Sequence, residues 1–427
     1  MPVALDKVAG TNLADVQETF KRVYLMAVDA VPDATPLTQA LGRTRKFKAG
    51  PDGLYFNVKL APGGTVANVP EGRSLPSPSA PKRKQGKVGL AHTYTTIAVG
   101  GQSIPLTQDT KKAFVSNLED QLEDGMLRVS LDMERQYNGD GRGILAILKT
   151  VVSAPSYLLE KPYGGLASWG PGTMLMQEGM EVAFINPANG TERGRATVST
   201  VNYDTETVTL SGTIAGGAIG DYVVLCNDVN ATGTDKATNY LAEATGVLAV
   251  CNKGDVFENI DGGAYRRWNS DRLLNSATPR AITEKLLAQA DARVKAKAGR
   301  RANLIYTTRG IAIEYQNLLA GRHQYQGETS GLKDSGLDAI TVNGRTMIEG
   351  DWCPKGWTFL LNTGKEYAGM VDLVSMGYID LDGAKLHRVE GKHVYVAYLW
   401  FPHQSIWFDR QAHIAIGDLI DDATILR

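Results

Sequence analysis

The chain has 427 residues, a mass of 46.1 kDa and a formal net charge of −1. This length allows two or three domains with a substantial core. The near-neutral charge argues against general polyanion binding, and the ordinary apolar and charged fractions are typical of a folded soluble protein.

The first 45 residues are expected to form an N-terminal arm that begins with a helix from Asn12 to Ala30. TNLADVQETF supplies a threonine or asparagine as N-cap and acidic residues in the first turn. Val31-Pro32 then ends the helix, because the residue before a proline disfavours the helical conformation.

An extended loop is predicted from residue 46 to residue 105. Between Arg43 and Pro105 there are seven prolines and two basic clusters, RTRKFK (43–48) and KRKQGK (82–87). Strand-like runs at 54–60 and 92–100 flank a proline-rich tip at 69–81, which predicts a long hairpin-like excursion. A basic loop of this length rarely packs on its own domain, so we expect it to lie on another molecule.

The strongest periodic pattern follows, within residues 106–140. Apolar residues spaced three or four apart form one stripe of a long helix from Lys112 to Asn138, and Gly125 in that stripe marks a bend. The stripe consists of Val115, Leu118, Leu122, Met126, Val129, Met133 and Tyr137. The outer face is expected to be acidic, with Glu119, Asp120, Glu123, Asp124, Asp132 and Glu134.

Short runs rich in Val and Thr, separated by turn residues, predict an inserted small all-β domain at 173–228. The second half is mixed. We expect a helix from Ile282 to Ala296, a buried strand at 303–307, a helix from Arg309 to Ala320 and a strand pair turning on Asn343-Gly344. The C-terminal third is again strand-like. The predicted fold class is α+β, with antiparallel sheets.

No secretion signal or membrane span is expected. The start, MPVALDKVAG, has no basic segment followed by an apolar one, and the longest apolar run, Val394 to Phe401, is far shorter than the ~20 residues of a membrane-spanning helix. Cysteine occurs only at Cys226, Cys251 and Cys353, without a CxxC pair, so we expect reduced thiols in a cytosolic setting.

The glycine-rich stretch NGDGRG, residues 138–143, is the best candidate for a ligand-binding loop. As a calcium loop it would put Arg142 and Lys149 at ligand positions, and as a dinucleotide loop it follows a helix where a strand is needed. The remaining interpretation is that its glycines end the helix in left-handed conformations and reverse the chain.

Other catalytic patterns are missing from the sequence. The six histidines form no HExxH motif, and there is neither a GxSxG elbow nor a phosphate-binding GxxxxGK[ST] loop. The aromatic run at 398–408 could stack bases, but an aromatic and aliphatic strand favours a core position. We therefore expect no enzyme, no cofactor, no metal and no catalytic residue.

Charge is distributed unevenly between the loop and the long helix. Residues 43–90 hold ten Lys or Arg and two acids, a balance of +8, whereas residues 109–140 hold eight acids and four bases, a balance of −4. We hypothesise that Lys82, Arg83, Lys84 and Lys87 of one subunit lie over Glu119, Asp120, Glu123 and Asp124 of the next. The alternative is a loop that lysine merely keeps soluble.

The order of these elements resembles the major capsid proteins of tailed bacteriophages with the Hong Kong 97-like fold. Those proteins have an arm, an extended loop, a spine helix and an Asn-Gly-Asp-Gly turn before a Gly-Ile-Leu segment, here Glu134 to Leu148, ERQYNGDGRGILAIL. This sequence departs from the family by having fewer residues between the two halves of that motif. Three later segments are also similar to family stretches: 254–270, 301–327 and 341–370.

The resemblance implies a domain organisation and a function. It implies an N-terminal arm (1–45), an E-loop (46–105), the spine helix of a peripheral domain (106–140), an axial domain (141–370) with the inserted β-domain, and the C-terminal part of the peripheral domain (371–427). The implied protein self-assembles as hexamers and pentamers into an icosahedral virion shell made in the host bacterial cytoplasm. It encloses double-stranded DNA without sequence-specific binding. Portal, scaffold and decoration proteins are the implied partners.

Two other functions remain open. An encapsulin-type compartment would have the same fold around protein cargo, and the inserted module and long loop favour the virus over it. A carbohydrate-binding virion surface or tail protein would instead use the β module at 173–228 for glycans.

Overall fold

The computed structural model describes residues 35–61, 63–100, 111–163, 171–320, 340–342, 344–372, 377–378, 387–388 and 394–421. The predicted helix at 12–30 lies outside them. The chain divides into two compact units. Unit 1 contains Met1–Gln39, Ala91–Glu134 and Asp372–His403, and unit 2 contains Ala40–Leu90, Arg135–Val371 and Gln404–Arg427. No helix of the described residues is both long enough and apolar enough to cross a membrane.

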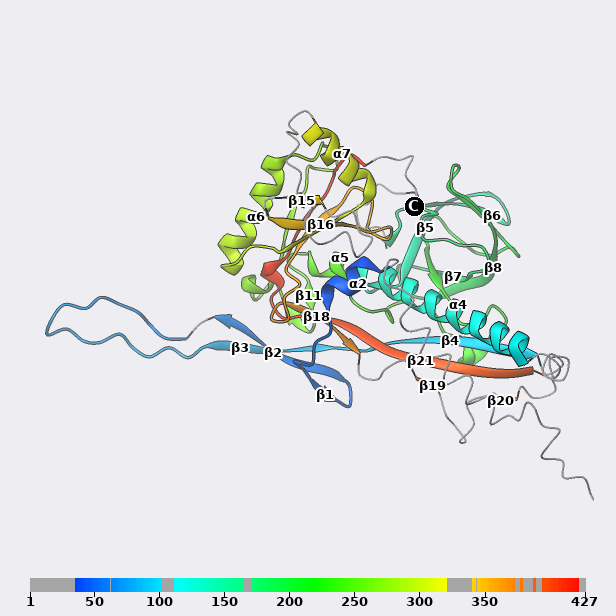
Figure 1. The fold of residues 1–427 in the computed structure, drawn as a ribbon, viewed down its shortest axis with the longest axis horizontal. Coiled ribbons are helices and arrows are strands. Elements are labelled where there is room, and N and C mark those ends of the chain that lie inside the picture. Colours follow the sequence, from blue (N-terminus) through cyan, green and yellow to red (C-terminus); the bar gives the residue numbers. More distant parts are fainter. Residues whose placement is uncertain are drawn as a thin grey trace, which may run out of the picture. The chain divides into compact units, whose positions relative to one another are not determined.

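The predicted long helix is confirmed as α4, Lys111–Asn138. Its stripe residues Met126, Val129, Met133 and Tyr137 are all buried. In unit 1, α4 runs along β4 (Ala91–Gly100) and β21 (Val394–Trp407), which pair antiparallel (Figure 1). The same sheet includes β18 (Ala368–Asp372), β19 (Gly377–Tyr378) and β20 (His387–Arg388).

The extended loop of unit 2 is a hairpin, but its strand partners differ from the prediction. β1 (Lys48–Gly50), β2 (Gly53–Ala61) and β3 (Lys82–Val88) form a three-stranded sheet. The predicted partner of β2 at 92–100 was wrong, since that segment is β4 and pairs with β21. The basic cluster KRKQGK is the actual partner strand. Its residues are mostly polar, so it lacks the alternation of apolar and polar residues that predicts a strand.

A closed six-stranded barrel follows in unit 2, with strand order β10-β5-β6-β9-β8-β7. The predicted module supplies β7 (Glu181–Ile185), β8 (Glu192–Asn202), β9 (Thr207–Leu210) and β10 (Tyr222–Leu225). The other two strands, β5 (Ile144–Ser153) and β6 (Ser156–Glu160), precede the predicted start at residue 173. The barrel is therefore larger than the predicted module, and its status as an inserted domain stays a prediction.

The second half builds a mixed six-stranded sheet rather than the expected antiparallel one. Its order is β13 (Asp271–Leu273), β22 (Ile414–Ile416), β17 (Thr358–Leu361), β14 (Leu304–Thr307), β16 (Arg345–Glu349) and β15 (Ile340–Val342). Two pairs are parallel, β13 with β22 and β14 with β16. The second pair is parallel because α7, Arg309–Ala320, lies between the two strands in the chain and carries it back to the starting end.

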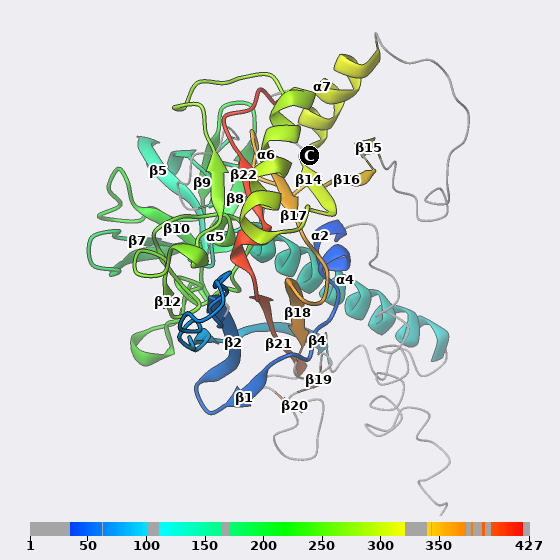
Figure 2. The ribbon, with the colours of Figure 1, turned by 90° about the vertical axis from the view of Figure 1, so that its left-hand side faces the viewer.

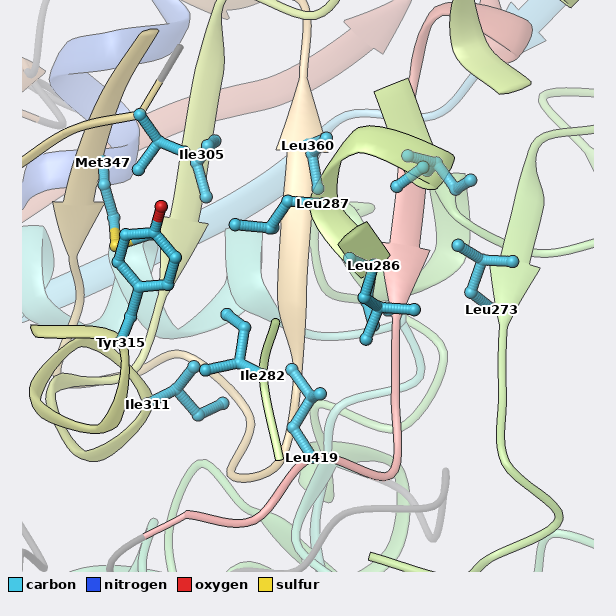
Figure 3. Close-up of a cluster of buried hydrophobic side chains, with 14 of the residues drawn as sticks. Leu273, Ile282, Leu286, Leu287, Ile305, Ile311, Tyr315, Met347, Leu360 and Leu419 are labelled. Atoms are coloured by element: carbon cyan, nitrogen blue, oxygen red, sulfur yellow. The ribbon is translucent and has the colours of Figure 1, made fainter. Parts of the chain in front are cut away.

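Helices α6 (Glu284–Ala298) and α7 cover one face of this sheet, as Figures 1 and 2 show. Figure 3 shows the core between them, where Leu287 of α6 and Ile311 of α7 share a cluster with Ile305 and Leu360 of the strands. The helix predicted at 282–296 is α6, which ends two residues later than predicted, at Ala298, where Gly299 adopts a left-handed φ of 76° at the C-cap.

Shorter elements complete unit 2. They are α2 (Pro36–Leu41), which begins in unit 1, α5 (Val247–Val250), β11 (Val256–Phe257), β12 (Ile260–Asp261) and the short 3-10 helices η3 (Gly233–Asp235), η4 (Arg266–Trp268) and η6 (Arg410–Ala412).

The turn after α4 generates a stability prediction. A Cβ at Gly143, whose φ is 73°, would overlap the backbone oxygen of Asn239, whereas a Cβ at Gly220, whose φ is 91°, meets nothing within 4 Å. We expect Gly220→Ala to lower the free energy of unfolding by about 1 kcal/mol and Gly143→Ala by roughly 3 kcal/mol. Denaturant unfolding of both variants would test this, and equal losses would contradict the close approach at Gly143.

Candidate functional site

The segment between β2 and β3 is almost entirely exposed. Of residues 63–81, only Val69 and Pro76 are partly covered. The side chains of Val66 and Leu75 are 96% and 84% exposed. The two limbs of the segment meet through a hydrogen bond of 2.8 Å from Gly64 N to Ser79 O. This exposed segment, residues 63–81, is the excursion drawn in blue at the left of Figure 1.

Exposed apolar side chains on an extended segment indicate a missing partner surface. Fully burying a Val or Leu side chain is worth about 1.5–3 kcal/mol each, which the isolated chain does not gain here. Single exposed apolar residues are common on protein surfaces, but these two occur on a segment with almost no covered residue. The exposed segment is therefore the first part of the candidate site.

The base of the hairpin, in contrast, packs on its own unit. Leu54, Phe56, Val58 and Leu60 alternate along β2 and are all buried. The Phe56 ring meets Phe408 edge to face, with centroids 5.5 Å apart. The expectation that the whole loop lies on another molecule is thus wrong for its base and stays a prediction for the exposed segment.

The four predicted basic contact residues all lie on β3, but they do not share one environment. Lys84 Nζ lies 5.3 Å from the ring centre of Tyr265. Lys87 Nζ lies 3.7 Å from a carboxylate oxygen of Asp52. Lys82 and Arg83 are exposed and form no ion pair with any residue that the structure describes. Lys82 and Arg83 are therefore the better candidates for contacts with another molecule.

Arg83 also has a like charge directly opposite. The register of the hairpin pairs Lys59 with Arg83, and both side chains are exposed. Like charges in a cross-strand pair are destabilising, by up to about 1 kcal/mol. A negatively charged partner surface over this pair would offset the repulsion between the two cations.

The predicted acidic partners Glu119, Asp120, Glu123 and Asp124 lie in consecutive turns of α4, and their side chains are outside the described part of the structure. Their contact with the basic strand of another subunit stays a prediction. Glu134 does not belong to an exposed acidic face, because its side chain is fully buried. That part of the prediction was wrong.

Glu134 instead holds the start of α2 within unit 1. Its Oε1 accepts a hydrogen bond of 2.8 Å from Leu37 N, and its Oε2 accepts bonds from Thr38 N at 2.9 Å and Thr38 Oγ1 at 2.5 Å. Burial raises the pKa of Glu134 to about 7, although these hydrogen bonds oppose the shift. No local pattern predicts this role, since the donors lie 96 and 97 residues away in the chain.

The glycine-rich stretch after α4 is a turn, as predicted. Gly141 and Gly143 have left-handed φ values of 81° and 73°, and the Asp140 carboxylate accepts a hydrogen bond of 3.0 Å from Arg142 N. Among the described residues, no group of three or more His, Cys, Asp or Glu could hold a metal ion.

The histidines of the C-terminal strands lie in the core. His403 and His413 are buried, and burial lowers the pKa of His403 to about 4 and that of His413 to about 3. Both rings are therefore neutral near pH 7. His413 Nδ1 accepts a hydrogen bond of 3.3 Å from Asn362 N, which is a structural contact.

Comparison with known proteins shows the fold. No family model and no curated protein matches the chain. Among solved structures, the cyanophage A-1(L) capsid asymmetric unit is similar at 14% identity, a TM-score of 0.52, and coverage of 92% of this chain and 94% of that chain. The capsid of a native GTA particle is 9% identical, with 92% of each chain covered and a TM-score of 0.44. A Mycobacterium phage Bobi chain is 9% identical, with 92% and 94% covered and a TM-score of 0.43.

The similarity to the cyanophage capsid chain extends over nearly the whole length of both chains. This similarity confirms the expected fold, an α+β capsid fold of the Hong Kong 97-like type.

The buried Glu134 generates a pH prediction. Because its folded pKa of about 7 exceeds its ordinary value of 4.5, the folded state holds the proton that the unfolded state releases. The contribution of Glu134 to the free energy of unfolding should therefore fall by roughly 3 kcal/mol as pH rises between these two values, and this contribution should level off above pH 7.

Glu134→Gln should lack this contribution, and it should also be destabilised at low pH because its amide NH₂ would face a backbone N–H. Glu178→Gln, at an exposed position, is the matched control and should follow the wild-type curve. Urea unfolding at a series of pH values gives the three curves. Parallel curves for the wild type and Glu134→Gln would rule out this linkage.

Proposed function

We propose that this chain is the major capsid protein of a tailed bacteriophage, and that copies of it assemble into the icosahedral shell around a double-stranded DNA genome. The observation that carries the proposal is the exposed segment 63–81 on a chain with a capsid fold. A segment that leaves Val66 and Leu75 in water gains its stability from neighbouring copies.

The way in which the hairpin is held suits a repeated contact with a neighbouring copy. Its base is fixed to unit 2 by the buried face of β2, so the segment has a defined root from which to reach a neighbour. Hexamers and pentamers of one sequence would repeat this contact at every subunit, giving interfaces larger than the ~1,600 Å² of a standard complex.

The domain assignment carries over as part of the proposal. Residues 1–45 would be the arm, 46–105 the E-loop, 106–140 and 371–427 the peripheral domain, and 141–370 the axial domain. The grouping of α4 with β4 and most of β21 in one compact unit supports a peripheral domain that is built from segments distant in the sequence.

The near-neutral net charge of the chain supports a shell that encloses DNA without binding it tightly. The formal net charge of the chain is −1, so electrostatic attraction to phosphates is weak overall. Portal, scaffold and decoration proteins would be its further partners, as in other tailed-phage shells.

The apolar side chains of the exposed segment provide the first test. In Val66→Ser/Leu75→Ser the free energy of unfolding of the subunit should change by less than about 0.5 kcal/mol, because exposed side chains are replaced. Assembly should fall sharply. Electron microscopy of purified wild-type protein should show closed icosahedral particles of uniform size, and the variant should give few.

A wild-type chain that remains monomeric, or a variant that assembles as well as the wild type, would overturn the proposal. Protein cargo rather than DNA in particles isolated from cells would instead favour a compartment shell.

The basic strand provides the second test. Lys82→Glu/Arg83→Glu should reduce assembly without unfolding the subunit, and the loss should grow at low salt, where repulsion between like charges is least screened. Lys149→Glu/Lys253→Glu, a matched double reversal at exposed lysines of the same unit, is the control. Light scattering over a range of salt would measure assembly, and equal effects of the two double variants would contradict a specific role for β3.

A further inference from the structure

The two-residue turn between β11 and β12 adopts a conformation that its side chains disfavour. Glu258 and Asn259 have φ values of 50° and 64°. Two-residue hairpin turns prefer such left-handed positions, but Asn, Asp or Gly normally occupies them, and glutamate is an uncommon choice. Contacts outside the turn must therefore hold Glu258 in place.

Those contacts join the turn to two distant parts of unit 2. The backbone oxygen of Glu258 accepts a hydrogen bond of 2.9 Å from Lys87 N on β3. Its carboxyl Oε1 accepts one of 3.1 Å from Trp407 N at the end of β21. A single residue thus ties the root of the extended loop to the C-terminal strand.

The carboxyl group of Glu258 is buried with incomplete hydrogen bonding. The residue is 7% exposed, and Oε2 has no hydrogen-bond partner among the residues that the structure describes. Burial raises the pKa of Glu258 well above its ordinary value, opposed by the Trp407 N–H and by Arg410. The acid is therefore held in a site that favours its neutral form.

Arg410 does not neutralise this acid by direct pairing. Its guanidinium lies 2.8 Å from Asp255 and donates hydrogen bonds to the carbonyl oxygens of Val250 and Ala249 at 2.6 and 2.7 Å. The other charged groups on the elements packed here are Lys82, Arg83, Lys84 and Lys87 of β3, Asp261 of β12, Arg266 and Arg267 of η4, and Asp409 before η6. Lys84 lies over Tyr265 and Lys87 pairs with Asp52, so both are already engaged.

We propose that Glu258 is a proton-dependent latch that holds the root of the extended loop. In the protonated state the neutral carboxyl group stays buried and keeps its bond from Trp407 N, and the strained turn offers its carbonyl oxygen to Lys87 N. When the carboxyl group releases its proton to solvent, the carboxylate has one oxygen without a partner in a dry site. The carboxylate then moves toward water, the turn relaxes, and β3 loses its bond to the turn.

The latch would give the loop two states with a simple trigger. Only the biological use of the latch rests on the proposed function, because a loop that contacts a neighbouring copy needs a defined direction at its base. The release follows rising pH, because the folded state binds the proton more tightly than the open state does.

Hydrogen exchange of the Lys87 and Trp407 amides in the full chain tests the proposal. After correction for intrinsic chemical exchange, their protection should fall as pH rises from mildly acidic to mildly alkaline values, by at most about tenfold per pH unit for one linked proton. Glu258→Gln keeps an acceptor for Trp407 N but cannot ionise, so its protection should not change with pH. Glu134→Gln, in unit 1, should keep the wild-type pH response.

A second variant separates the latch from simple stability. Asn259→Gly keeps a residue type that tolerates the left-handed conformation, so the protection of both amides should keep the wild-type pH response. Wild-type protection that does not change with pH, or a Glu258→Gln response equal to that of the wild type, would overturn the latch. Hydrogen exchange can be measured whether or not the chain assembles. If shells form but the protection of the two amides does not change with pH, only the latch is overturned. If the protection changes with pH as expected but no shells form, only the proposed function is overturned.

Discussion

The structure depends on one constraint, which is that the β2–β3 hairpin can bury only the lower part of its apolar face. From Leu54 to Leu60 the inward side chains of β2 are covered, and beyond them the chain continues into water with Val66 and Leu75 uncovered. The base of the hairpin packs within its own subunit. The exposed segment needs a surface that the described part of the chain does not provide. The proposed shell satisfies this requirement by repetition, because each copy supplies the surface that another lacks.

Sequence patterns predicted the elements whose cause is local. The bounds of α7 agree with the predicted helix because Ile311, Ala312 and Tyr315 recur at helical spacing, and the turn at Gly141 and Gly143 follows from glycine itself. β3 was missed because its outward residues are nearly all charged, so that only Gly86 and Val88 are buried. The parallel pairing of β14 with β16 depends on where α7 returns the chain, which no local pattern encodes.

Two buried carboxyl groups join segments of the chain that are distant in the sequence. Glu134 accepts bonds from the backbone of α2, and Glu258 links β3 to the end of β21. Neither role could be predicted, because glutamate on a helix or in a turn is normally solvated and the partners are far away in the sequence. A buried acid gives a directional anchor whose strength depends on its proton, whereas apolar packing at the same place would not respond to pH.

The closed barrel has a consequence for crowded copies. Each of its six strands has a hydrogen-bonded neighbour on both sides, so the barrel has no edge strand, although the end of β5 pairs only with β6. Where many identical subunits meet at high local concentration, an open edge would invite strand exchange and irregular aggregates. A closed barrel leaves less unpaired backbone for such exchange when it is crowded against its own copies.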